Sequence, residues 1–219
     1  MNWQFIIDSI PRFVDATILT LELGIIGIIL SIVIGLICSN LMFYQVKIFK
    51  EISKIYIELS RNTPLLIQLF FLYYGLPKMG IKLSGFACGI IGLAFLGGSY
   101  MAEAFRGGLE AVSKGQIESG MSIGLNKLQI FRYVILPQAF SISIPSIGAN
   151  CLFLLKETSI VGAIAVADLM FLAKDIIGME YKTTEALFLL VVSYLIILLP
   201  VSLLISYLEK RGRRAKYGV

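Results

Sequence analysis

Long apolar runs alternate with short polar segments along this chain of 219 residues. Several runs approach the roughly 20 apolar residues that a helix needs to cross a bilayer, and we place five spans in them. The spans cover about residues 16–39, 64–80, 84–104, 138–161 and 184–207. Spans two to four are shorter or richer in Gly and Ser than a lone anchor, as expected of helices that pack closely together. The pattern predicts an all-α integral membrane protein with five transmembrane helices, forming a single domain over residues 1–219 without internal repeats.

The composition supports a membrane protein. The chain is 58% hydrophobic and 15% charged, whereas a soluble domain is about 25% charged. Histidine is absent, and the cysteines, Cys38, Cys88 and Cys151, all lie within apolar spans. This usage is typical of buried thiols and of neither a disulfide framework nor a metal site. We therefore expect no metal and no cofactor in this chain.

Basic residues gather in alternate polar segments. Of the 19 lysines and arginines, most lie at about residues 40–61, at about 105–137 and in the tail "EKRGRRAKYGV". The other segments hold few: Arg12, Lys78, Lys82, Lys174 and Lys182, while Lys156 lies within the fourth span. Because basic residues collect on the cytoplasmic side, we expect the N-terminus outside and the C-terminus in the cytoplasm. We expect the lipid bilayer, and no nucleic acid, as the partner of this charge.

The segment between spans three and four, "GQIESGMSIGLNKLQIFRYVILPQAF", mixes polar and apolar residues. Gly124 offers a left-handed helix stop in its middle, and Pro137 follows where span four begins. Two patterns have the form of capping boxes: Ser113 with Gln116, and Asn126 with Gln129. The segment therefore predicts a cytoplasmic hairpin of two short helices over about residues 110–137, which we call the polar hairpin.

The polar hairpin has more apolar residues than a solvated loop needs: Ile117, Met121, Ile123, Leu125, Leu128 and Phe131. Such a surface is typical of a docking site for another protein. The alternative is a hairpin that packs only under its own membrane helices.

The spacing within the polar hairpin resembles the EAA loop of ATP-binding-cassette importer permeases. That loop reads Glu-Ala-Ala, three residues, Gly, nine residues, Ile, one residue, Leu-Pro. Here Glu118, Ser119 and Gly120 are followed at the same spacings by Gly124, Val134 and Leu136-Pro137. The departures are Ser119 and Gly120 for the alanines and Val134 for Ile, and Gly120 is expected to loosen the first helix by up to about 1 kcal/mol.

The flanking sequence is similar to the polar amino acid branch of these permeases. The stretches that carry this similarity are "RNTPLLIQLFFLYYGLP", "AEAFRGGLEAVSKGQ", "LPQAF" and "LLKETS". Together with the spacing of the hairpin, the resemblance covers about residues 16–213, which is nearly the whole chain.

The resemblance implies a permease subunit in the bacterial cytoplasmic (inner) membrane. It implies pairing with a second permease subunit, identical or homologous, and with two cytoplasmic ATPase subunits that bind ATP and Mg. An extracytoplasmic amino-acid-binding protein would deliver the substrate. By position, the resemblance assigns ATPase docking to Glu118, Ser119, Gly120, Gly124, Leu125, Leu136 and Pro137.

No pattern for an enzyme occurs in the sequence. The nearest approach to a phosphate-binding loop, "GLPKMGIK" from Gly75, has Ile81 where lysine must stand. We expect no enzyme activity in this chain, with ATP hydrolysis in a separate subunit.

Charges within the spans indicate a substrate path, because an isolated charge in a bilayer is costly and faces a partner or a cavity. Glu22 lies in span one, and Lys156 and Glu157 lie in span four. A zwitterionic amino acid needs an acceptor for its ammonium, such as Glu157, and a donor for its carboxylate, such as Asn150. The candidates are Gln68, Ser146, Asn150, Lys156 and Glu157, where Ser143, Ser146, Asn150 and Glu157 share one helical stripe.

An alternative for Lys156 and Glu157 is that they neutralise other charges within a dimer or lie near the outer interface. Asp168, Asp175 and Glu180 follow span four. We expect these three acids to form the outer surface or the docking site of the binding protein.

A second functional class is a self-sufficient channel or an ion-coupled secondary transporter for small solutes. For such a carrier we expect internal repeats or discontinuous spans in matched halves. The sequence indicates neither, which favours the permease subunit.

Overall fold

A computed structural model describes residues 1–217 of the chain, with side chains through residue 211. Every regular element among these residues is helical, which confirms the all-α prediction. The elements are α1 (Trp3–Phe43), α2 (Lys47–Arg61), α3 (Leu65–Phe70), η1 (Phe71–Gly75), η2 (Leu76–Met79), α4 (Gly85–Glu110), α5 (Lys114–Ser122), α6 (Lys127–Ile130), η3 (Phe131–Ile135), α7 (Leu136–Glu157), η4 (Thr158–Ile164), α8 (Leu169–Glu180) and α9 (Thr183–Tyr217).

Four helical stretches are long and apolar enough to cross a membrane. They cover Trp3–Phe43, Gly85–Glu110, Lys127–Ile164 and Thr183–Arg211, and a shorter apolar stretch covers Leu65–Met79. The first, third and fourth run well beyond the expected spans, since they continue past the apolar residues into polar ends. The side chains of Arg213, Arg214 and Lys216 in the basic tail lie outside the described residues.

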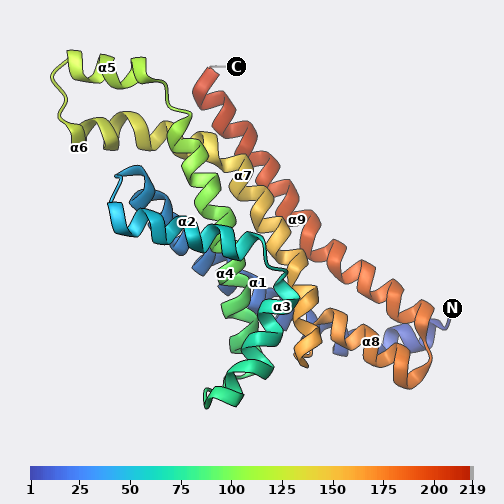
Figure 1. Ribbon diagram of the computed structural model, residues 1–219. Coiled ribbons are helices and arrows are strands. Elements are labelled where there is room, and N and C mark those ends of the chain that lie inside the picture. The colour runs from blue at the N-terminus through green and yellow to red at the C-terminus, as the bar shows by residue number, and fades with distance from the viewer. Residues whose placement is uncertain (218–219) are drawn as a thin grey trace.

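The polar hairpin and the N-terminus lie at opposite ends of the molecule (Figure 1). The short helices α5 and α6 project from the end where α9 terminates, while α8 lies beside the N-terminal part of α1 (Figure 1). The predicted hairpin therefore projects from one end of the helical bundle.

Helices α1 and α4 form the closest-packed pair, because small residues let their backbones approach. A side chain at Gly35 would place its Cβ 2.5 Å from the Cβ of Met101, and one at Gly97 would overlap Ser31 and Leu154. The hydroxyl of Ser31 donates to the carbonyl of Gly27 at 2.7 Å and to that of Leu93, across the interface, at 3.3 Å. Gly and Ser in the spans thus act in helix packing, as the sequence predicts.

The segment from α2 to η2 is interrupted at Asn62, Thr63 and Pro64, at the point where the second span was expected to begin. Neither Asn62 nor Thr63 caps α3, and Pro64 does not lie in its first turn. Pro64 itself is the N-cap of α3, without a side-chain bond. The side chains of Asn62 and Thr63 instead donate back to the carbonyls of Glu58 and Leu59. Helix α2 ends at this point because the backbone before a proline avoids helical geometry.

Two π turns occur at matching sequences. Phe71–Gly75 precedes Leu76-Pro77, and Phe131–Ile135 precedes Leu136-Pro137. In each, the backbone N–H of the leucine bonds to the carbonyl of the phenylalanine, five residues back. The wide turn accommodates a proline that lacks the N–H of a regular helix. The expectation that the second arm of the hairpin ends at Pro137 is therefore wrong, since the helix continues through it into α7.

The end of the molecule near the N-terminus contains a fully buried acid. Asp168 is the N-cap of α8, where its Oδ1 accepts from the backbone N–H of Phe171 at 2.8 Å. Its side chain is completely inaccessible, so the expectation that Asp168 lies on the outer surface is wrong. Asp175 and Glu180 are paired with Arg12, at 3.7 and 2.7 Å, on the accessible surface.

Candidate functional site

The turn of the polar hairpin is fixed by its backbone. Gly124 adopts a φ of 83°, in the left-handed region, which confirms the predicted helix stop. Its N–H bonds to the carbonyl of Met121 at 2.9 Å, and the N–H of Leu125 bonds to that of Gly120 at 3.1 Å. This pair of bonds is the Schellman arrangement that closes a helix.

The two arms of the hairpin begin differently. Asn126 and Gln129 form a complete capping box, as predicted, with bonds of 2.9 and 2.8 Å. The capping box predicted at Ser113 and Gln116 is wrong, because Ser113 stands at the N-cap of α5 without a side-chain bond. Only a backbone bond, from the Gln116 N–H to the Ser113 carbonyl, supports that first turn.

The hairpin packs inward at its base and stays open at its tip. Ile130 and Ile135 are buried in a cluster with Leu109 and Val112, against which Ile117, Leu125 and Phe131 also pack. By contrast, 77% of Ile123 and 72% of Leu128 are exposed, and Met121 is exposed as well. Both readings of the sequence are thus present: the base packs on the protein's own helices, and the tip carries an uncovered apolar surface.

The residues of the EAA pattern take distinct positions in the hairpin. Glu118 and Ser119 are exposed on α5, and Leu136 and Pro137 are exposed at the start of α7. Gly120 is buried between the arms, where an added Cβ would lie 3.3 Å from Ile130 and 3.7 Å from Leu125 and Val134. Alanine, the residue of the pattern at this position, nearly fits, and glycine leaves a small gap.

A second candidate site is a cavity of about 310 Å³ beside the interruption between α2 and α3. It is walled by the interruption, the middle of α4 and the end of α7, and we call it the central cavity. Its polar lining is Arg61, Asn62, Thr63, Tyr100 and Glu157, and its apolar lining includes Leu65, Leu66, Leu96, Phe153 and Ile160. Its volume lies in the range of small-molecule sites, about 300–1,000 Å³.

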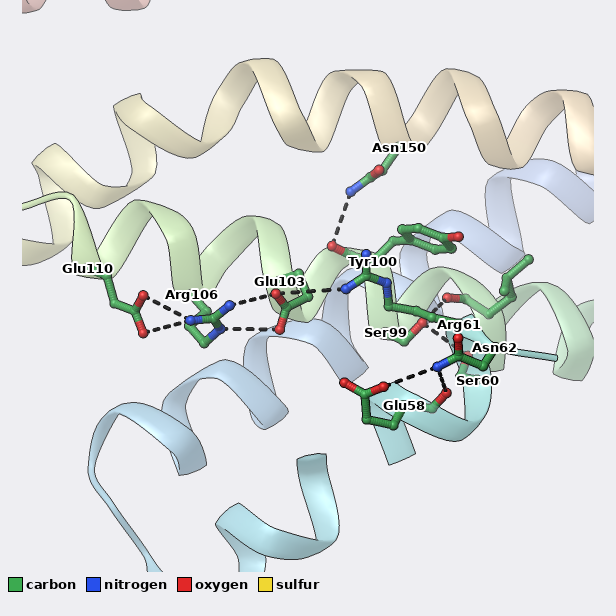
Figure 2. Close-up of polar contacts among 11 residues, drawn as sticks. Glu58, Ser60, Arg61, Asn62, Ser99, Tyr100, Glu103, Arg106, Glu110 and Asn150 are labelled. Atoms are coloured by element: carbon green, nitrogen blue, oxygen red, sulfur yellow. Dashed lines mark hydrogen bonds and ion pairs between the residues drawn. The ribbon is translucent and has the colours of Figure 1, made fainter. Parts of the chain in front are cut away.

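Arg61 is the functional candidate that the sequence analysis missed, because we counted it only among the basic residues of a loop. Its guanidinium lies 5.3 Å from the centre of the Tyr100 ring and 3.9 Å from a carboxylate oxygen of Glu103 (Figure 2). The signal was present in "RNTP", where a proline interrupts the helix next to a charge and two hydrogen-bonding side chains. An arginine and an acid, Glu157, therefore line the same cavity.

The other predicted substrate-path residues do not gather in the central cavity. The amide of Asn150 donates to the backbone carbonyl of Tyr100 at 3.2 Å (Figure 2). The amide of Gln68 donates to the carbonyls of Ser60 and Thr63, at 3.2 and 2.9 Å. Both amides thus hold walls of the cavity.

The other residues of the stripe, and the charged residues Glu22 and Lys156, also lie outside the central cavity. Ser146 and Lys156 are exposed on α7, and Glu22 is exposed on α1. Ser143 is buried and donates to the Ala104 carbonyl of α4 at 3.1 Å. The structure brings only Glu157 of the predicted stripe into the cavity.

Comparison with known proteins identifies the class. The chain belongs to the family of binding-protein-dependent transport system inner membrane components, whose pattern matches residues 27–214. It is 34% identical to the probable glutamine ABC transporter permease protein GlnM of Bacillus subtilis, over 96% of this chain and 98% of that protein. It is 30% identical to the glutamine transport system permease protein GlnP of Escherichia coli, over 96% and 97%.

Solved structures agree with this assignment. An amino acid ABC transporter crystallised with histidines superposes with a TM-score of 0.90 at 33% identity, covering 96% of this chain and 99% of that one. The MetNI methionine ABC transporter, at 19% identity and a TM-score of 0.74, shares the fold. The permease family named in the sequence analysis is thereby confirmed.

The family sets the coarse role of the chain. It is a multi-pass inner-membrane permease subunit of an ATP-driven importer. The partners of such a subunit are an ATPase and a substrate-binding protein. Permease subunits are not themselves enzymes and carry no cofactor, so ATP hydrolysis belongs to a separate subunit. A self-sufficient channel or ion-coupled secondary transporter does not fit this family, although the interruption at Pro64 gives the chain one discontinuous segment.

Proposed function

We propose that this chain forms the translocation path of an ATP-driven importer for polar amino acids. The observation that carries the proposal is the central cavity, which Glu157 and Arg61 both line. A zwitterionic amino acid needs both an acceptor for its ammonium and a donor for its carboxylate. A desolvated, hydrogen-bonded charge pair is the contact that gives such a site its selectivity.

The substrate path is then built from contacting and supporting residues. Glu157 and Arg61 contact the substrate, while Asn150 and Gln68 hold the cavity walls through their amide bonds. Ser146 and Lys156 are exposed on α7, and we assign them to the face that meets a second permease subunit, identical or homologous. Such pairing keeps Lys156 out of lipid, where an unpartnered charge is costly.

Five spans follow if the interrupted segment crosses the membrane together with the four long helices. The short apolar stretch Leu65–Met79 needs part of α2 to complete a crossing. With the basic residues inside, the N-terminus lies outside, and the hairpin and the C-terminus lie in the cytoplasm. The surface around Arg12, Asp175 and Glu180 then faces outward, where an extracytoplasmic amino-acid-binding protein docks.

The polar hairpin is the coupling element in this proposal. Its exposed tip, with Met121, Ile123 and Leu128, inserts into a groove of the cytoplasmic ATPase dimer, which binds ATP and Mg. Glu118 and Ser119 lie on the exposed side of α5. Gly120, Gly124 and Leu125 shape the turn, and Leu136 and Pro137 join the hairpin to α7. Because α7 also carries Glu157, movement of the hairpin reaches the substrate site through one helix.

The test is purification of this chain in complex with an ABC ATPase and an amino-acid-binding protein of the same organism. ATP hydrolysis by the complex in proteoliposomes is measured with the binding protein and a panel of amino acids. We expect polar amino acids to stimulate hydrolysis and aliphatic ones to have no effect. Equal rates with every amino acid, at normal assembly of the complex, would reject the proposal.

A further inference from the structure

Four charged residues form a row between the interruption and the hairpin end of α4, and we call them the charge ladder. They are Arg61 on α2 and Glu103, Arg106 and Glu110 on α4 (Figure 2). Arg106 contacts Glu103 at 2.7 Å and both carboxylate oxygens of Glu110 at 2.9 Å, and Glu103 lies 3.9 Å from Arg61. Acid and base alternate along the row.

The charge ladder lies between two cavities, each of which has charged residues in its lining. Arg61 lines the central cavity. Arg106 and Glu110 line a second cavity, of about 400 Å³, which we call the end cavity and which also includes Gln45, Lys50 and Lys54. Glu103 lines neither cavity, but it contacts Arg61 of the central cavity and Arg106 of the end cavity. It therefore stands at the boundary between the cavities.

The face that carries the charge ladder is unsuited to lipid. The side chains of Glu103 and Arg106 are 28% and 34% exposed, and charged side chains at the boundary of a membrane face protein or water and not lipid. The lipid-compatible face of α2 is a different one. It carries the exposed residues Ile48, Ile52, Ile55 and Leu59, spaced as one helical stripe. The ladder thus meets water or protein, as the wall of a path does.

We propose that the end cavity is a second, exit-side subsite for the amino acid and that the charge ladder is the gate between it and the central cavity. This inference rests on the proposed function. A substrate carboxylate competes for Arg61 and then Arg106, and its ammonium competes for Glu103 and then Glu110. The substrate exchanges one ion pair at a time, so neither its charges nor those of the protein lose all partners. The pairs are partly exposed and therefore weak enough to open.

The test uses proteoliposomes that contain the complete transporter and are preloaded with a labelled amino acid, and it measures efflux without ATP. Glu103→Gln removes the charge that holds both arginines, so efflux rises about fivefold, which corresponds to about 1 kcal/mol. Asp8→Asn is the matched control, because it also removes one negative charge, and Asp8 is exposed on α1 near the N-terminus, where it accepts from the amide of Gln4 at 3.1 Å. Its efflux stays at the wild-type rate.

Efflux at the wild-type rate in an assembled Glu103→Gln transporter would overturn the gate. If that variant does not assemble, Arg106→Lys takes its place, because lysine cannot bridge two carboxylates as a guanidinium does. Wild-type efflux in that variant would also overturn the gate. ATP-dependent uptake by the unaltered transporter is measured in the same vesicles. Its absence for every amino acid would reject the proposed function, whereas normal uptake with unchanged variant efflux would reject only the gate.

Discussion

The side-chain amide of Asn150 donates a hydrogen bond to the backbone carbonyl of Tyr100, with 3.2 Å between nitrogen and oxygen. This bond joins α7 to the middle of α4 beside the central cavity, which Tyr100 lines. Asn150 is thereby occupied as a structural link between two walls of the cavity, two helical turns from Glu157.

Asn150→Ala tests this supporting role. The loss of one hydrogen bond is expected to lower stability by about 1 kcal/mol. Uptake of a cationic and of a neutral amino acid should fall by the same factor, because the substrate loses no direct contact. Thermal unfolding of the purified complex and uptake of both substrates are measured together. Selective loss of one substrate at unchanged melting temperature would instead place Asn150 in contact with the substrate.

Glu157→Gln tests the substrate contact. The amide removes the negative charge of the cavity at nearly constant shape, so uptake of cationic amino acids should fall most, by about tenfold or more. Yield of the complex should hold. Lys156→Gln, the exposed neighbour on α7, is the matched control and should leave the ratio of cationic to neutral uptake unchanged. A fall in yield with equal losses for every substrate would show that Glu157 is structural.

Gly124→Val tests the coupling hairpin. A β-branched residue at a φ of 83° is strained by about 1–2 kcal/mol and disfavours the turn that presents the tip. The variant should insert into the membrane but lose co-purification of the ATPase and ATP-driven uptake. Gly124→Asn is the control, since asparagine tolerates the left-handed conformation. Normal ATPase recovery with Gly124→Val would refute the docking role.

Asp168→Asn tests the buried acid near the N-terminal end. Burial raises the pKa of Asp168 from 3.8 to about 7, against the opposing effects of the Phe171 N–H and the Lys174 charge. Since the folded state holds this proton more tightly than the unfolded state, stability is lost as the pH rises from about 4 through about 7. Asparagine keeps the helix cap and does not ionise, so the melting temperature of the variant should fall less over this range.

The control for that measurement is Asp175→Asn, an exposed acid paired with Arg12 at 3.7 Å. It should retain the pH dependence of the unaltered protein. An identical pH dependence in Asp168→Asn would show that Asp168 is not the group that titrates.

The sequence predicts those features that depend on local chemistry. Apolar runs indicate helices because the bilayer admits no unpaired backbone groups. Gly124 and the pair Asn126 and Gln129 predict their turn and cap because each needs only residues within one turn. The all-helical fold and the hairpin could be predicted from the sequence for this reason.

Features that depend on contacts beyond one helical turn could not be predicted from the sequence. Asp168 follows a span, as a surface acid does, yet the fold buries it. Pro137 predicts a helix end, but a π turn accommodates it. The central cavity joins Arg61 to Glu157, residues far apart in the sequence, and no periodicity brings those two elements together.

Uptake of a labelled polar amino acid into proteoliposomes tests whether this chain transports only as a subunit of an ATP-driven importer. The vesicles carry this chain either alone or with its ATPase, and the binding protein is added outside. We expect uptake only with the ATPase, the binding protein and enclosed ATP all present, and none when an ion gradient replaces ATP. Uptake by this chain alone, driven by an ion gradient, would contradict this expectation.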